Sequence, residues 1–165
     1  MKPEHRWRFW WVWLFVAAYI YFIFSNSLEV ASASETLSEK VSTALLSILS
    51  RFSLYSSNFS LFNHYVRKLA HFSEFAGLGF LVSLAMHICP LFRSRFFNFT
   101  LFLVAVPFAD ETIQRYVPGR SPQFHDMLID GSGFLFGAFF CYALILILMD
   151  LTGFVQRGRR KKTGA

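Results

Sequence analysis

Charged residues are scarce in this chain. Only 16% of its 165 residues are Asp, Glu, Lys or Arg, whereas 55% are hydrophobic. A water-soluble domain of this size has too little interior to hide so much apolar surface, so the composition indicates a lipid bilayer as the solvent. Cysteine is also rare: Cys89 and Cys141 lie in apolar surroundings, which favours small core residues over a disulfide or a metal pair.

Recognised catalytic signatures are absent as well. The chain contains no HExxH, GxSxG or CxxC motif, so the sequence identifies no cofactor and leaves open whether the protein is an enzyme. The formal net charge is +6, but no basic run is interleaved with aromatic residues outside the apolar stretches. Nucleic acid is therefore not expected as a partner, and the basic residues are better explained as cytoplasmic flanks of membrane helices.

Four apolar stretches predict helices that cross the bilayer, at residues 9–24, 69–89, 96–113 and 127–149. Each approaches the roughly 20 residues that a crossing helix needs, and the first and third are slightly short. The prediction is an all-α protein: a four-helix transmembrane bundle over residues 7–150 and a basic cytoplasmic tail over residues 151–165.

The first stretch has an alternative interpretation as a cleaved signal peptide. Basic residues precede it, and the small residues Ala31-Ser32-Ala33 follow it. Its length and the four tryptophans between residues 7 and 13 instead favour a retained helix with an aromatic belt at one interface.

The long connection between the first two stretches is predicted to contain an amphipathic helix. Apolar residues recur at helical spacing, at Leu37, Val41, Leu45, Ile48, Leu49 and Phe52. Thr36 and Glu39 resemble a capping box for this helix, and residues 53–65 read as a loop. We expect the helix to lie on the outer leaflet or over the bundle.

The basic residues also predict the orientation. With four crossings, the N-terminus, the 90–95 connection and the C-terminal tail share one face, and that face carries most of the basic residues. This face is predicted to be cytoplasmic. Most acidic residues fall toward the opposite, outer face. Acidic residues do not set topology, so this asymmetry needs another cause.

Nine polar residues are predicted to meet at the outer ends of the helices. An ionised group at the bilayer centre costs roughly 2.5–3.5 kcal/mol, so such residues lie at the interface, pair with one another or line a polar cavity. Several are three or four residues apart and therefore share a helix face. The candidate binding residues are Lys68, His71, Glu74, Asp110, Glu111, Gln114, Arg120, Asp126 and Asp130.

Two local motifs are expected to bring these residues together. Val117-Pro118-Gly119 reads as a tight turn that would return Arg120 to the helix ends. Gly133 and Gly137 form a GxxxG pair, which would allow the second and fourth helices to approach closely.

Three blocks of sequence resemble the VanZ-like family of small bacterial membrane proteins: "KLAHFSEFAGLGF", "DETIQRYVPGR" and "DMLIDGSGFLFG". Their order and spacing fit the family, and together they contain the nine candidate residues. The resemblance implies a four-crossing protein of the cell membrane, with lowered susceptibility to the lipoglycopeptide teicoplanin as the family-level function. It also implies Asn in many relatives where this chain has Asp130, so this cluster is more acidic.

Several functions of the polar cluster are left open. It would act as a structural network if it only held the helix ends together. It would act as a binding site if it recognised or shielded an envelope lipid, a wall precursor or the drug, with aromatic residues holding an acyl chain. Transport is disfavoured, because four helices are few unless the protein forms a homo-oligomer, and the charges do not cross the membrane.

An enzyme acting on a lipid-linked phosphate or a cell-wall intermediate is the alternative function. Lys68 and Arg120 would bind the phosphate, and His71, Glu74 or Glu111 would act as acid or base. A divalent metal is a further option, with Glu111, Asp126 and Asp130 as ligands.

The predicted orientation can be tested by cysteine labelling of intact cells with a membrane-impermeant maleimide. We expect Ser121→Cys to be labelled from outside and Ser94→Cys to be labelled only after the cells are opened. The reverse pattern would show that the topology is inverted.

Overall fold

The computed structural model of the chain describes residues 10–52, 58–120 and 124–163. Their elements, in order, are α1 (Val12–Ser27), α2 (Ala31–Leu49), the short 3-10 helix η2 (Ser50–Phe52), α3 (Phe59–Ile88), α4 (Arg95–Gln114) and α5 (Phe124–Thr163). No strand occurs among these described residues, which confirms the all-α prediction.

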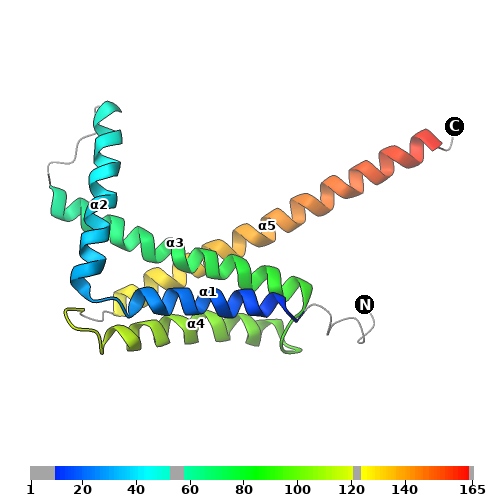
Figure 1. Cartoon of the computed structure of the whole chain (residues 1–165). Coiled ribbons are helices and arrows are strands. Elements are labelled where there is room, and N and C mark those ends of the chain that lie inside the picture. The colour runs from blue at the N-terminus through cyan, green and yellow to red at the C-terminus, as the bar shows by residue number, and fades with distance from the viewer. Residues whose placement is uncertain (1–9, 53–57, 121–123, 164–165) are drawn as a thin grey trace.

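The helices α1, α3, α4 and α5 form the bundle, and α2 stands across one end of it (Figure 1). The start of α1 and the end of α5 lie toward the opposite end (Figure 1). The most extensive helix contact is between α3 and α5, and α1 packs against both α3 and α4. This arrangement confirms a four-helix bundle with an additional helix in the long connection.

The exterior of the bundle is apolar. Within the part of the chain that the structure describes, three helical segments are long and apolar enough to cross a membrane, namely Phe59–Ile88, Arg95–Gln114 and Phe124–Thr152, and α1 is a shorter apolar helix. At most 28% of the most apolar segment of each is buried inside the protein, so most of these side chains face outward, where lipid would solvate them. Because α1 has 16 residues, it is about 24 Å long and shorter than a typical hydrocarbon core.

The second predicted span is too short at its start. The helix α3 begins at Phe59, so residues 59–65, predicted as a loop, are helical. The Asn58 side chain caps this helix by accepting a hydrogen bond from the Leu61 N–H at 3.1 Å. The buried Asn63 accepts one from the Ser42 hydroxyl of α2 at 2.9 Å. These polar residues are a helix cap and a helix contact, two roles that composition alone does not distinguish from a loop.

The predicted amphipathic helix is confirmed as α2, but its predicted start is wrong. The helix begins at Ala31, after Val30, which provides no side-chain cap. Thr36 therefore lies inside the helix, where its hydroxyl donates to the Ser32 carbonyl at 2.8 Å and forms no capping box. Leu37 and Ile48 of α2 are exposed.

Glycines allow α3 and α5 to pack backbone against backbone. A Cβ atom on Gly133 would collide with the carbonyl of Phe72, and one on Gly137 would collide with the carbonyl of Ala76. In the other direction, Gly79 of α3 meets the carbonyl of Phe134. The predicted close approach of the second and fourth spans is therefore confirmed, and it places the polar residues of the two helices side by side.

The helix contact predicts a sharp difference between two glycine substitutions on α5. Gly137→Ala forces the added methyl against backbone, and we expect it to lower the stability by about 1–3 kcal/mol. Gly131→Ala is the matched control, because its Cβ would make only an ordinary contact with the Leu103 side chain at 3.8 Å. Thermal unfolding of the purified proteins in detergent measures both. Equal stabilities would contradict this account of the α3–α5 contact.

Candidate functional site

Asp110 of α4 joins α1 to α4 at one end of the bundle. Its carboxylate is fully buried and accepts hydrogen bonds from the Ser27 hydroxyl at 2.5 Å and from the Gln114 side-chain amide at 2.8 Å. The Gln114 amide also reaches the Ser27 hydroxyl at 3.4 Å. Gln114 is one helical turn after Asp110, so the predicted i, i+4 pair is present and its partner on α1 is Ser27.

Two pairs of polar residues link α3 to α5. Lys68 and Asp126 form an ion pair that is half-buried. His71 Nδ1 lies 3.8 Å from Asp130 Oδ1. Asp130 is fully buried, yet neither of its carboxylate oxygens accepts a hydrogen bond from any residue that the structure describes. Both links follow from the close packing of the two helices.

Arg120 returns to the helix ends through a tight turn, as predicted. The Arg120 N–H donates to the Val117 carbonyl at 3.2 Å, and Gly119 has a φ of 80°, a conformation that glycine adopts without strain. The guanidinium donates to the carbonyls of Asn26 at 3.0 Å and of Glu29 at 3.1 Å. These hydrogen bonds tie Arg120 to the last turn of α1 and to the connection between α1 and α2.

The remaining acidic residues occupy two positions. Glu74 of α3 accepts a hydrogen bond from the Asn26 side-chain amide at 2.7 Å, which ties α3 to the end of α1. Glu111 follows Asp110 on α4 and is also buried. Its carboxylate repels that of Asp130. Arg115, the residue after Gln114, is exposed.

A cavity of about 390 Å³ opens where α1, α2, α3 and the Arg120 turn meet. Polar residues supply part of its wall: Asn26, Ser27, Glu29, Ser34, Ser38, Arg67, His71, Glu74 and Arg120. Apolar residues supply the rest: Phe22, Leu37, Val41, Val66 and Ala70. The cavity thus combines charged and apolar surfaces within one space.

The structure separates the nine predicted residues into three groups. His71, Glu74 and Arg120 line the cavity. Asp110, Gln114 and Asp130 are buried and contact its lining residues Ser27 and His71, while Glu111 is buried on α4. Lys68 and Asp126 pair with each other and do not line the cavity.

Sequence reasoning missed the contribution of α1 and its junction with α2. Asn26 and Ser27 bind Glu74, Asp110 and Arg120 directly. The available signal was the polar run Ser25-Asn26-Ser27, which follows the first apolar stretch at its predicted outer end. Arg67, next to Lys68, was also missed as a cavity residue.

Charged groups of both signs surround Arg120 at the cavity wall. Burial lowers the pKa of the Arg120 guanidinium, and the neighbouring Arg67 lowers it further, whereas the nearby carboxylates of Asp110, Glu29 and Glu74 raise it. An arginine side chain remains charged in proteins despite such shifts. The two guanidinium groups therefore place positive charge on the cavity.

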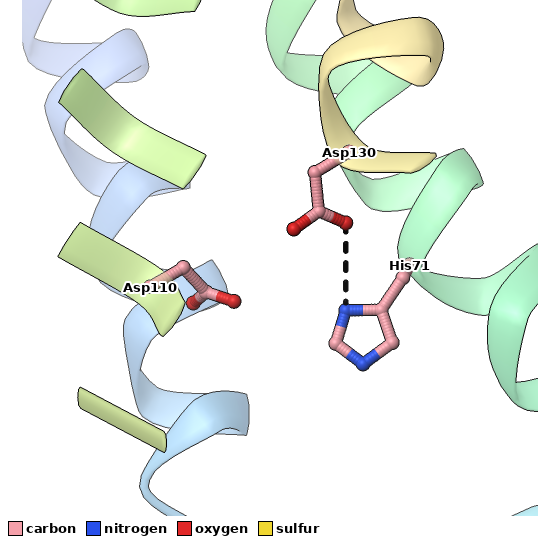
Figure 2. A group of neighbouring side chains, drawn as sticks. All are labelled: His71, Asp110 and Asp130. Carbon is pink, nitrogen blue, oxygen red and sulfur yellow. Dashed lines mark ion pairs between the residues drawn. The ribbon is translucent and has the colours of Figure 1, made fainter. Parts of the chain in front are cut away.

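Three residues from three helices converge beside the cavity. His71 of α3, Asp110 of α4 and Asp130 of α5 point toward one another (Figure 2), and each offers one ligand atom within 4.8 Å of the other two. The metal set considered from sequence was Glu111, Asp126 and Asp130. Only Asp130 is common to the two sets, because Asp126 pairs with Lys68.

A second cavity, of about 410 Å³, contains none of the nine candidate residues. It lies between α3, α4 and α5, and its lining residues include His87, Arg95, Phe99 and Phe139. Its wall is mainly apolar, so it is a poorer candidate than the 390 Å³ cavity for binding a charged group, although its volume is slightly larger.

Comparison with known proteins identifies one family. The family model described as VanZ/LLP1 matches residues 10–148, which include α1, α2, α3, α4 and all nine candidate residues. No curated protein and no solved structure gives a significant match.

Proposed function

We propose that this chain, which belongs to the VanZ/LLP1 family of membrane proteins, binds an amphiphilic component of the cell envelope in the cavity at the outer end of its bundle. The protein would span the cell membrane several times, with both termini in the cytoplasm. Binding would shield or modify the envelope component, and lowered susceptibility to teicoplanin would be the consequence.

The dual character of the 390 Å³ cavity is the observation that carries this proposal. Arg67 and Arg120 offer guanidinium groups, which bind phosphate oxygens in a bidentate manner. Phe22, Leu37 and Val41 offer apolar surface on the same cavity, which suits the chain attached to such a head group. A lipid-linked phosphate or wall precursor combines these two chemistries.

A purely structural role explains the cluster less well. Ser27 and Gln114 satisfy Asp110, and Lys68 neutralises Asp126, as expected for groups that hold helices together. Asp130 is different, because it is buried without a hydrogen-bond donor among the described residues. Such a group costs folding free energy, and a protein retains it more readily for function than for stability.

The alternative is a membrane enzyme acting on the same class of lipid-linked phosphate. His71 and Glu74 both line the cavity, and Asp130 lies 3.8 Å from His71 Nδ1. A carboxylate in this position orients an imidazole and stabilises its protonated form, as in acid–base catalysis. Conversion of a polyprenyl phosphate or pyrophosphate by the purified protein would favour this alternative over simple binding.

The proposal gives each part of the chain a role at the membrane. Residues 7–150 would form the membrane domain, and the basic residues 151–165 would contact anionic lipids on the cytoplasmic side. The amphipathic α2 would lie at the outer interface and form one wall of the cavity. A homo-oligomer is compatible with this arrangement and would leave the cavity within each chain.

The proposal predicts that Arg120→Gln and Glu74→Gln abolish protection in a teicoplanin-sensitive Gram-positive host, whereas Arg115→Gln does not. Arg115 is the matched control, because it lies five residues before Arg120 but is exposed to the surroundings. The minimum inhibitory concentration is measured at equal membrane levels, confirmed by immunoblot. Glu74→Gln keeps the side-chain shape, so its loss of protection would report charge rather than folding.

Binding is measured separately, by native mass spectrometry of the purified variants with a polyprenyl phosphate. Loss of the bound lipid in Arg120→Gln, with retention in Arg115→Gln, is the expected result. Equal lipid binding by all four proteins would contradict the proposed cavity, and equal protection by all four would contradict its role in susceptibility.

A further inference from the structure

The convergence of His71, Asp110 and Asp130 has the composition of a metal site. One imidazole and two carboxylates supply a nitrogen and two oxygens, from α3, α4 and α5 respectively (Figure 2). Imidazole favours zinc and its neighbours among the transition metals, and carboxylates also suit manganese. Ligands carried by three different helices hold such an ion more rigidly than ligands in a loop.

Asp130 provides an independent indication that this cluster can bind a ligand. Its side chain is 1% exposed, and both carboxylate oxygens lack a hydrogen-bond partner among the described residues. The buried His71 Nδ1, which faces Asp130 in Figure 2, also lacks one. Buried carboxylates are normally paired, hydrogen-bonded or bound to a metal, and Asp130 is directed at the space between His71 and Asp110.

The local charge balance leads to the same conclusion. The carboxylates of Asp110, Asp126, Glu111 and Glu74 all repel Asp130. Lys68 pairs with Asp126, and the Arg120 guanidinium donates to backbone carbonyls, so neither of these two cations donates to Asp130. A divalent cation between the three side chains would offset the concentration of negative charge directly.

We propose that His71, Asp110 and Asp130 bind a divalent transition-metal ion of the zinc or manganese class. Ligand atoms about 2.0–2.2 Å from an ion are at most about 4.4 Å apart. The 3.8 Å separation of His71 Nδ1 and Asp130 Oδ1 is within this limit. The ligand atoms of all three residues lie within 4.8 Å of one another, so binding an ion requires only a small inward shift of side chains.

The surroundings of Asp110 suit this role. The Ser27 hydroxyl and the Gln114 amide each donate to one of its oxygens, and such donors orient a metal-binding carboxylate. Three protein ligands also leave a coordination position for water or a ligand oxygen. Because His71 lines the 390 Å³ cavity, that position lies next to the cavity.

Metal binding is tested on the full-length protein purified in detergent and stripped with EDTA. Titration with MnCl₂, followed by the electron paramagnetic resonance signal of free Mn²⁺, should show one ion bound per chain, and Zn²⁺ should displace it. Asp130→Asn and Asp110→Asn should each weaken binding at least about tenfold. Asp126→Asn is the matched control and should change the affinity much less than these two variants do, because Asp126 pairs with Lys68 outside the three-residue set.

The imidazole ligand has its own spectroscopic readout. Pulsed electron paramagnetic resonance of bound Mn²⁺ should show a ¹⁴N coupling in the wild type and in Asp126→Asn, and this coupling should be absent from His71→Gln. Size-exclusion profiles identify any variant that fails to fold. Metal binding is then compared only among the variants that fold.

Three results would overturn the metal site: no stoichiometric binding by the wild type, equal loss of affinity in Asp126→Asn and Asp130→Asn, or an unchanged ¹⁴N coupling in His71→Gln. The probe is the metal alone, so each of these results leaves the proposed lipid-binding function untouched.

Discussion

The backbone contact between α3 and α5 is the interaction on which the polar site depends. Gly79, Gly133 and Gly137 each meet a carbonyl of the facing helix, so the two helices approach more closely than side chains would allow. This approach places His71 of α3 against Asp130 of α5, and the same two helices carry the Lys68–Asp126 pair. An apolar packing requirement thus determines which charged groups become neighbours.

Most of the bundle surface is apolar, so few groups are available to stabilise a buried carboxylate. The free-energy cost of burying each carboxylate therefore depends on its hydrogen-bond partners. Asp110 and Asp130 are both fully buried, but they differ in their surroundings. Asp110 accepts two hydrogen bonds, from α1 and from its own helix. Asp130 accepts none from the described residues and faces a histidine. The first arrangement stabilises helix packing, whereas the second gives up stability and creates a place where a cation or a proton can be held.

Sequence periodicity was sufficient for the helices but not for their contacts. The third span was predicted within one residue of Arg95–Gln114, because hydropathy and length define such a helix directly. The start of α3 was missed, because Asn58 and Asn63 look like loop residues until their partners on α2 and α3 are known. The Pro118-Gly119 turn was predictable because its conformation is local, and it correctly returned Arg120 to the helix ends.

The sequence predicted which polar residues share a helix face, but not which residue of one helix contacts which residue of another. The Ser27–Asp110 bond joins residues far apart in the chain, and it depends on the rotation of α1 and α4 about their axes. Helical spacing specifies the faces within each helix but leaves that rotation undetermined. The metal set suggested by sequence was Glu111, Asp126 and Asp130, whereas the structure pairs Asp126 with Lys68 and brings His71 and Asp110 to Asp130.

The central claim is that the buried Asp130 serves function at the expense of stability, and thermal unfolding of Asp130→Asn in EDTA tests it most directly. The account predicts that this variant is more stable than the wild type, by about 1–3 kcal/mol, because the substitution removes a buried carboxyl group that lacks a hydrogen-bond donor and lies among other acidic groups. Saturating Mn²⁺ should then raise the stability of the wild type but not of the variant. A variant that is less stable than the wild type in EDTA would show that Asp130 holds the bundle together, and would contradict the account.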